Sequence, residues 1–227
     1  GPWRKRSGSA EAVKVLVTAG PTREAIDPVR FVSNRSSGKM GYAVAEAALA
    51  AGHAVRLISG PVALEAPRGA KLVRVTTAAE MLAAVKKHVR ACDVLVMAAA
   101  VADWRPKKSA PLKLKKSAGP PRIAWVATPD ILKSIAPLKK NAQVFCGFAA
   151  ETNRVAAEAK RKLREKNLDA IAANDVSKKG RGFEADRNAL AIHLAGGRAV
   201  RVALATKKVC ARKLLGVLEE IFAQKKK

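Results

Sequence analysis

A short polar segment, Ser36-Ser37-Gly38-Lys39-Met40, carries residue types that bind phosphate. A predicted helix follows it, and both the free N–H groups and the dipole at a helix N-terminus favour an anion. A Walker phosphate loop would need Gly at position 33 and Ser or Thr at position 40. Ser33 and Met40 stand there instead, which excludes that motif. The segment alone is equally compatible with an anion site and with ordinary helix capping by serine.

Other enzyme motifs are incomplete in the sequence. Residues 20–24 read GPTRE, where a dinucleotide site would show Gly-x-Gly-x-x-Gly after the first strand. Tyr42 is followed by Val-Ala-Glu, so the Tyr-x-x-x-Lys pair of a short-chain reductase is missing. The three histidines, His53, His88 and His193, fall in unrelated predicted elements, and no cluster has metal-ligand spacing.

Two lysines share one face of a predicted helix. At about 100° per residue, Lys162 and Lys166 lie within roughly 40° of each other, on the sector that also holds Val155 and Ala159. Lysines on an apolar face either extend their ammonium groups to solvent near the helix end or meet a buried anion. The spacing alone leaves both interpretations open.

The elements that would position these residues alternate between strand and helix. Apolar runs predict strands at residues 14–20, 54–59, 93–100, 143–148 and 170–173. Helices are predicted over residues 40–51, from Thr77 onward, over 130–138 and over 153–167. This alternation indicates an α/β fold with a doubly wound, mostly parallel, Rossmann-like sheet. Ligands of such sheets bind at the carboxyl ends of the strands.

The remaining chain predicts an arm and a closing unit. Residues 104–121 are rich in Lys, Pro, Ser and Gly, which is typical of a flexible basic arm, and residues 123–126 predict an edge strand. A C-terminal β-hairpin turns at Gly196-Gly197, and a helix follows it. We expect a remnant of a purification tag and a linker at 1–12, one domain over 13–224 with its arm at about 104–126, and a disordered basic tail at 225–227.

The charge of the chain is strongly positive. Its 227 residues include 44 Lys and Arg against 18 Asp and Glu, a formal net charge of +26. This charge suits an enzyme for polyanionic small molecules, a nucleic-acid-binding protein of Rossmann-like fold, or a basic source proteome. Aromatic residues are only 4% and do not interleave with the lysines, and no base-reading motif is present, which disfavours the second possibility.

Compartment and redox state can also be predicted. Cys92, Cys146 and Cys210 are widely spaced in apolar stretches, which is typical of reduced, buried thiols. No apolar run approaches the roughly 20 residues of a membrane span, and the first residues have no signal-peptide core. We therefore expect a cytoplasmic protein without a membrane partner.

Seven segments in order carry a specific resemblance. They are VTAGPTREAIDPVRFVSNRSSGKMG from residue 17, AAAVAD from 98, KLKK from 113, TPDI from 128, GFAAET from 147, KNLD from 166 and ANDV from 173. Together they resemble the bacterial phosphopantothenoylcysteine synthetases of coenzyme A biosynthesis. The match covers nearly the whole chain after the first dozen residues, and although each piece is weak, the ordered set is specific.

The resemblance implies a two-step ligase reaction. The carboxylate of 4′-phosphopantothenate attacks the α-phosphate of CTP, with Mg²⁺ as cofactor, to give an acyl-cytidylate and pyrophosphate. The amine of L-cysteine then displaces CMP and forms an amide. Excess positive charge fits this chemistry, because cations offset the repulsion between a carboxylate and a phosphate and stabilise the leaving pyrophosphate.

The resemblance also implies roles for single residues. Asn34 would bind the acyl-phosphate end of the intermediate, and Lys113 would serve formation of the acyl-cytidylate. Thr128 stands where Asn is usual in the family, so the resemblance implies a contact of its backbone with the nucleotide but does not extend to its side chain. Magnesium would be held mainly by nucleotide phosphates, with help from Asp103, and no metal ligand is firmly assigned. The nucleotide-binding set is Met97, Ala98, Ala99, Asp103, Lys113, Thr128, Pro129, Asp130, Ile131, Phe148, Lys162 and Lys166. The phosphate- or substrate-binding set is Arg30, Ser36, Ser37, Gly38 and Lys39.

Assembly is implied in the same way. Members of the family are homodimers in which an arm reaches the neighbouring active site, and residues 104–121 are the candidate arm. In many bacteria this synthetase is the second half of a bifunctional protein that begins with a flavin decarboxylase. The resemblance therefore implies a homodimer, a fused or separate decarboxylase as possible partner, no flavin in this chain and no specific nucleic-acid partner.

Overall fold

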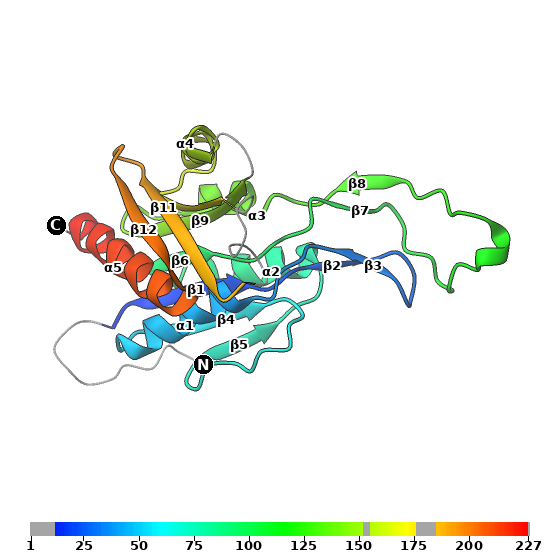
Figure 1. Cartoon of the computed structure of the whole chain (residues 1–227), viewed down its shortest axis with the longest axis horizontal. Helices are drawn as coiled ribbons and strands as arrows, with labels where there is room; N and C mark the ends of the chain where they lie inside the picture. Colours follow the sequence, from blue (N-terminus) through cyan, green and yellow to red (C-terminus); the bar gives the residue numbers. More distant parts are fainter. Residues whose placement is uncertain (1–11, 152–154, 176–184, 227) are drawn as a thin grey trace.

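A central sheet of eight strands organises the protein (Figure 1). The computed structural model describes residues 12–151, 155–175 and 185–226. Across the sheet the strand order is β12-β11-β10-β9-β6-β1-β4-β5. The strands are β1 (Lys14–Ala19), β4 (Ala54–Ser59), β5 (Lys71–Arg74), β6 (Val94–Met97), β9 (Val144–Glu151), β10 (Ala170–Asp175), β11 (Arg187–Leu194) and β12 (Ala199–Thr206).

The strand order confirms the predicted doubly wound fold. The strands from β5 across to β10 pair in parallel, and counted along the chain their order is 3-2-1-4-5-6, as in Rossmann folds. The predicted C-terminal hairpin, β11 and β12, adds two antiparallel strands beside β10. The order reverses between β1 and β6, and a ligand crevice is expected at that switch point.

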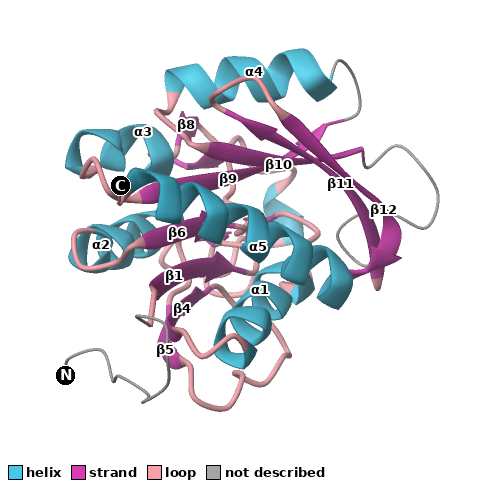
Figure 2. Ribbon diagram, turned by 90° about the vertical axis from the view of Figure 1, so that its left-hand side faces the viewer, coloured by secondary structure: helices cyan, strands magenta, loops and turns pink. Residues whose placement is uncertain are grey.

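Helices cover both faces of the sheet (Figure 2). On one face α1 (Lys39–Ala50) packs beside α5 (Lys207–Lys225). The other face is covered by α2 (Ala78–Val89), α3 (Ile131–Ile135) and α4 (Val155–Glu165). Within β1, Val15 and Val17 join the first core cluster and Leu16 the second. Burial on both sides explains why this strand is continuously apolar.

Side-chain caps fix the start of α2 and α3, as the Thr206 hydroxyl does for α5. The Thr77 hydroxyl accepts a hydrogen bond from the Glu80 N–H at 3.1 Å. The Glu80 carboxylate accepts in turn from Thr76, one residue before the position of a standard capping box. Asp130 caps α3 by accepting from Lys133 N–H at 3.1 Å, so the helix begins one residue later than predicted.

Two thin hairpins project from one end of the sheet (Figure 1). One pairs β2 (Arg23–Ala25) with β3 (Phe31–Ser33), where the sequence predicted neither strand nor helix. The other pairs β7 (Trp104–Pro106) with β8 (Trp125–Ala127). The loop between β7 and β8 contains a 3-10 turn, η1 (Lys116–Ala118). Residues 104–127 therefore form an arm, as predicted, but the strand expected at 123–126 pairs with β7 and is not an edge of the main sheet.

The C-terminal residues depart from prediction. Residues 225–227 were expected to be a disordered tail, yet α5 includes Lys225, whose Nζ lies 2.6 Å from Oδ1 of the buried Asp169. Oδ2 of the same carboxylate accepts from Nζ of Lys139 and from the main-chain N–H of Phe145. A second 3-10 turn, η2 (Ala136–Leu138), immediately precedes Lys139. The last turn of α5 is thus tied to the amino-terminal ends of β9 and β10.

The three cysteines are buried thiols, as the sequence predicted. All three are free and buried. Burial raises the pKa of the Cys92 and Cys146 thiols to about 12, which leaves them protonated and unreactive at neutral pH.

Candidate functional site: a cavity at the carboxyl ends of the strands

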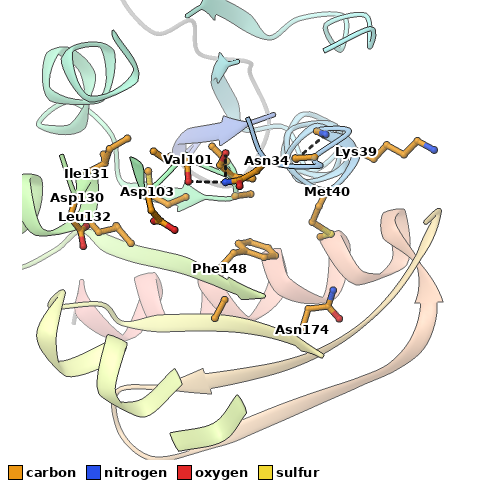
Figure 3. A pocket seen from close by; sticks show the side chains of 18 of the residues that line it. Asn34, Lys39, Met40, Val101, Asp103, Asp130, Ile131, Leu132, Phe148 and Asn174 are labelled. Atoms are coloured by element: carbon orange, nitrogen blue, oxygen red, sulfur yellow. Dashed lines mark hydrogen bonds between the residues drawn. The ribbon is translucent and has the colours of Figure 1, made fainter. Parts of the chain in front are cut away.

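A cavity of about 340 Å³ opens at the carboxyl ends of β1, β6 and β9, at the switch point (Figure 3). Most of the residues proposed from sequence lie in its wall. Those residues are Asn34, Ser36, Gly38, Lys39, Met97, Ala98, Ala99, Asp103, Thr128, Pro129, Asp130, Ile131, Phe148 and Lys166. The structure thus brings together residues that are up to 132 positions apart in the chain, and proximity alone does not assign their roles.

The chain that leaves β6 forms one wall. Ala99 N–H donates to the Thr18 hydroxyl at 3.2 Å, and Ala100 N–H donates to the Gly20 carbonyl at 2.9 Å. These bonds hold residues 98–101 flat against the end of β1. Small alanine side chains at this place leave room for a ligand to approach the backbone.

The start of α1 forms the opposite wall. Gly38 is the N-cap residue, has φ +77° and provides no side-chain cap. The Ser36 hydroxyl accepts a hydrogen bond from the Gly38 N–H at 3.3 Å. This bond lies just before the first turn of α1. Gly41 has no room for a side chain, because an added Cβ would lie 2.5 Å from the Ala19 Cβ. The first turn of α1 is therefore pressed against β1 and open toward the cavity.

Asn34 is oriented by two main-chain carbonyls. Its Nδ2 donates to Val101 at 2.9 Å and to Ala100 at 3.3 Å. Because Nδ2 makes both contacts, the group that Asn34 offers a ligand is Oδ1, an acceptor.

The two lysines of the helix predicted at 153–167 separate in the structure, where α4 ends at Glu165, before Lys166. Lys166 lines the cavity, and its Nζ lies 3.0 Å from Asp130 Oδ2. Burial acts to raise the pKa of Asp130, but hydrogen bonds from Lys133 N–H and Lys166 outweigh it and lower the pKa. Lys162 is half-buried and does not line the cavity.

Arg30 and Lys113 lie together in the projecting hairpins, outside the cavity wall. Arg30 Nη2 lies 2.5 Å from Asp27 Oδ2 and donates to the Leu114 carbonyl at 2.8 Å. Asp27 also accepts from Leu114 N–H at 3.1 Å. The hydrogen bond from Arg30 holds the pKa of Asp27 well below its usual range. The contacts of Asp27 and Arg30 with Leu114 fix the arm next to the exposed Lys113. Ser37, from the predicted phosphate-binding set, is half-buried and also lies outside the cavity wall.

Three polar residues of the wall were missed in the sequence analysis: Asn174, Asn188 and Lys207. Asn174 is 7% exposed, and its buried Oδ1 has no hydrogen-bond partner among the described residues. Its place at the carboxyl end of a parallel strand could have identified it. Asn188 and Lys207 are 4% and 6% exposed, and nothing in their sequence context distinguishes them from ordinary surface residues.

The described ranges contain neither a cluster of metal ligands nor a membrane-spanning helix. In 12–151, 155–175 and 185–226, no three His, Cys, Asp or Glu residues come together as metal ligands. The helices in these ranges include none that is both long and apolar enough to cross a bilayer.

Comparison with known proteins identifies the family. Residues 10–222 match the model of the DNA/pantothenate metabolism flavoprotein C-terminal domain. The chain is 45% identical over 214 residues to the coenzyme A biosynthesis bifunctional protein CoaBC of Vibrio parahaemolyticus, and 49% identical over 192 residues to that of Bacillus subtilis. These matches cover 93% and 84% of this chain but 53% and 47% of the relatives, so the chain spans about half of their length.

Solved structures agree. The crystal structure of the C-terminal domain of a CoaBC protein is 42% identical, with a TM-score of 0.80 over 93% of this chain and 96% of that one. A complex of a Cab2 mutant with phosphopantothenate-cysteine is only 16% identical and shares the fold, with a TM-score of 0.75 over 95% of this chain and 89% of that one. The chain therefore belongs to the family of the DNA/pantothenate metabolism flavoprotein C-terminal domain, as its ordered motifs indicated.

Proposed function

We propose that this chain is a phosphopantothenate–cysteine ligase that uses CTP. One observation carries the proposal: a single cavity collects Asn34, Asp103 and Lys166 with the segments at 97–99, 128–131 and 148. The names of the CoaBC relatives support a step of coenzyme A biosynthesis, and the Cab2 complex shows the product bound to a protein of the same fold. The buried, protonated thiols are consistent with a cytoplasmic enzyme.

In the first step the protein would bring two anions together. The phosphopantothenate carboxylate forms a bond to the α-phosphorus, while the bond from that phosphorus to the bridging oxygen breaks and pyrophosphate leaves with the electron pair. The first turn of α1 offers N–H groups to the phosphates, and Lys39 adds positive charge.

Magnesium, when bound, would neutralise phosphate charge. Asp103 is the residue that fits as a ligand, because its carboxylate lines the cavity and makes no ion pair with the described residues, whereas Asp130 is paired with Lys166. The other ligands would be phosphate oxygens and water.

In the second step the cysteine amine attacks the acyl carbon and CMP leaves. We assign Asn34 Oδ1 to accept a hydrogen bond from the amine, since its Nδ2 is already bonded to the backbone. This contact would direct the nitrogen lone pair at the acyl carbon, and the amine proton would be released to solvent.

The arm would complete the site of a second copy. Arg30 and Lys113 lie outside the cavity wall of their own chain, on hairpins that project from the body (Figure 1). Those hairpins expose large apolar side chains, including Trp104 (57%), Trp125 (45%) and Leu112 (78%), as a protein interface would require. We therefore propose a homodimer in which each arm carries its basic residues to the partner's cavity, and a flavin decarboxylase as a fused or separate partner.

The direct test is incubation with phosphopantothenate, cysteine and each nucleoside triphosphate in turn. Pyrophosphate release that needs phosphopantothenate and is fastest with CTP would support the proposal. Release with CTP in the absence of cysteine, at one equivalent per site, would show the acyl-cytidylate step by itself. Absence of pyrophosphate with every nucleotide would refute the ligase, and a preference for ATP would refute the cytidine specificity.

A further inference from the structure

A buried amide ends an apolar face of the sheet at the cavity. Along β10, Ala170 and Ala172 belong to the core cluster that includes residues of α1 and α5. Asn174 lies on the same face, because alternate residues of a strand point to the same side. Phe148 of β9 pairs with Ala172, so Asn174 lies two residues beyond that pair, toward the carboxyl end of β10. Its side chain lines the cavity (Figure 3).

The side chain of Asn174 is buried without a donor for its oxygen. Asn174 is 7% exposed, and its Oδ1 accepts no hydrogen bond from the described residues. Asn188 of the neighbouring β11 lines the same wall, but its Oδ1 accepts from the Ala189 N–H at 3.0 Å. A buried acceptor without a donor destabilises the folded protein, because its hydrogen bond to water is lost and not replaced. An amide at such a position indicates that a ligand of the cavity brings the donor.

Phe148 divides the cavity into two ends. Figure 3 shows Asp103 and Asp130 on one side of its ring, and Met40 and Asn174 on the other. The two carboxylates belong to the set proposed for the nucleotide, so we call their side the nucleotide end. On the other side, Met40 and Phe148 are apolar and pack on the same core cluster. A ligand that donates to Asn174 is therefore expected to carry its donor beside hydrocarbon.

We propose that Asn174 Oδ1 accepts a hydrogen bond from the pantothenate part of the acid substrate, from either its hydroxyl or its amide N–H. This inference rests on the proposed function and adds a substrate-binding residue to it. In 4′-phosphopantothenate the carbon that bears the hydroxyl stands between the amide and a carbon with two methyl groups. The methyl groups would contact Met40 and Phe148 while one of the two donors meets Asn174.

The other two reactants have acceptors elsewhere in the cavity. The donors of the nucleotide, its base amino group and its ribose hydroxyls, are expected at the nucleotide end, where Asp103 lines the wall. The amine of cysteine is assigned to Asn34 Oδ1, because Asn34 Nδ2 is bonded to the backbone. Phosphopantothenate is therefore the reactant whose neutral donors still need an acceptor, and Asn174 supplies one.

The experiment measures KM for phosphopantothenate and KM for CTP from rates of pyrophosphate release, on the parent chain, Asn174→Leu and Asn141→Leu. Leucine is close to asparagine in size but has no polar side-chain atom. Asn141 is exposed and does not line the cavity. We expect Asn174→Leu to raise KM for phosphopantothenate about tenfold, since one hydrogen bond to the substrate is lost, and to leave KM for CTP within about twofold. Asn141→Leu should match the parent in both constants.

Two substrate analogues identify the donor. One has hydrogen in place of the hydroxyl, and the other has an ester oxygen in place of the amide N–H. On the parent, the analogue that lacks the bonded donor should have a KM about tenfold above that of phosphopantothenate. On Asn174→Leu the same replacement should change KM by less than about twofold, because the acceptor is already gone. If both replacements raise KM on the variant as much as on the parent, neither donor meets Asn174 and the inference is overturned.

Thermal unfolding without ligands separates substrate binding from a structural role. Because Oδ1 has no partner among the described residues, Asn174→Leu should melt at the temperature of the parent or above it. A lower melting temperature with an unchanged KM for phosphopantothenate would show a structural role, and a raised KM for CTP alone would assign Asn174 to the nucleotide; either result would overturn this inference alone. A parent that releases no pyrophosphate would refute the proposed function as well. Asn174→Ala repeats the test should Asn174→Leu unfold.

Discussion

At the scale of the residue, the orientation of one amide has a kinetic consequence. Asn34→Ala removes the acceptor proposed for the cysteine amine and leaves the lining of the nucleotide end in place. We expect kcat for amide formation to fall about a hundredfold, as when a positioned hydrogen bond is removed from a transition state. Pyrophosphate release in a single turnover without cysteine should change far less.

Rapid-quench measurement of both half-reactions checks this assignment. Ser33→Ala is the control, because Ser33 bonds to the Thr22 carbonyl and does not line the cavity. Equal losses in both half-reactions would contradict the assignment of Asn34 to the amine.

Residues also show the limits of sequence reasoning. Asn34, Asp103 and Phe148 could be placed in the site because they belong to segments with recognisable order. Lys207 could not, because a lysine at a helix start resembles the many solvated lysines of this chain until burial is known. Arg30 was assigned to substrate without its counter-ion, although Asp27 stands only three residues away.

At the scale of the element, the contact of α1 with β1 depends on Gly41. Gly41→Ala would place a methyl group 2.5 Å from the Ala19 Cβ and 2.9 Å from the Thr18 carbonyl oxygen, so α1 must shift outward. We expect a loss of about 1–3 kcal/mol in the free energy of unfolding and weaker CTP binding, because the same turn lines the cavity.

Gly216→Ala is the matched control for that change. Gly216 lies within α5, and an added Cβ would meet nothing within 4 Å. Alanine is favoured over glycine in a helix by about 1 kcal/mol, so this variant should be more stable and bind CTP normally. Chemical denaturation measures the free energy of unfolding of both variants, and titration measures their affinity for CTP. A Gly41→Ala protein as stable as the parent would contradict the close contact of α1 with β1.

A second prediction at this scale concerns the salt bridges by which Asp169 holds the end of α5. Asp169→Asn would leave the ammonium groups of Lys139 and Lys225 without their shared carboxylate. Breaking a buried ion pair costs about 3–5 kcal/mol, and we expect a loss in that range in urea unfolding. Glu220→Gln removes the exposed pair with Arg198 and should cost less than about 1 kcal/mol. Similar losses of unfolding free energy for both variants would show that the Asp169 salt bridges do not hold α5 in place.

Elements differ in how well the sequence predicts them. Most strands of the main sheet were identified because burial on both faces makes them apolar throughout, as in β1 and β9. The edge strand β5 was not, since it is short and partly exposed. The hairpins β2–β3 and β7–β8 were not, since each strand is three residues long and partly exposed. A hydrogen bond between Asp27 and Leu114, 87 positions apart, joins the two hairpin regions, and such long-range contacts are not visible in local sequence patterns.

At the scale of the whole molecule, the proposed exchange of arms predicts complementation. Lys113→Met would remove a proposed catalytic group from the arm, and Asn34→Ala would remove one from the cavity. If each arm serves the other copy, each variant alone should be nearly inactive. A mixed dimer would contain one cavity with wild-type Asn34 and a wild-type Lys113 from its partner.

Coexpression and isolation of the mixed dimer give the measurement. We expect about half of the parent activity per dimer, from its one intact site. Mixed dimers as inactive as the single variants would show that both residues act within one chain, and a monomeric parent with full activity would refute arm exchange altogether.

The walls of the cavity come from stretches that begin at residue 34 and end at residue 207. A molecule bound there is a non-covalent crosslink between N-terminal and C-terminal stretches of the chain. Its binding free energy adds to the free energy of unfolding. Amide hydrogens in all these stretches should then slow their exchange with deuterium together when the cavity fills, including those at the start of α5, far along the sequence from α1.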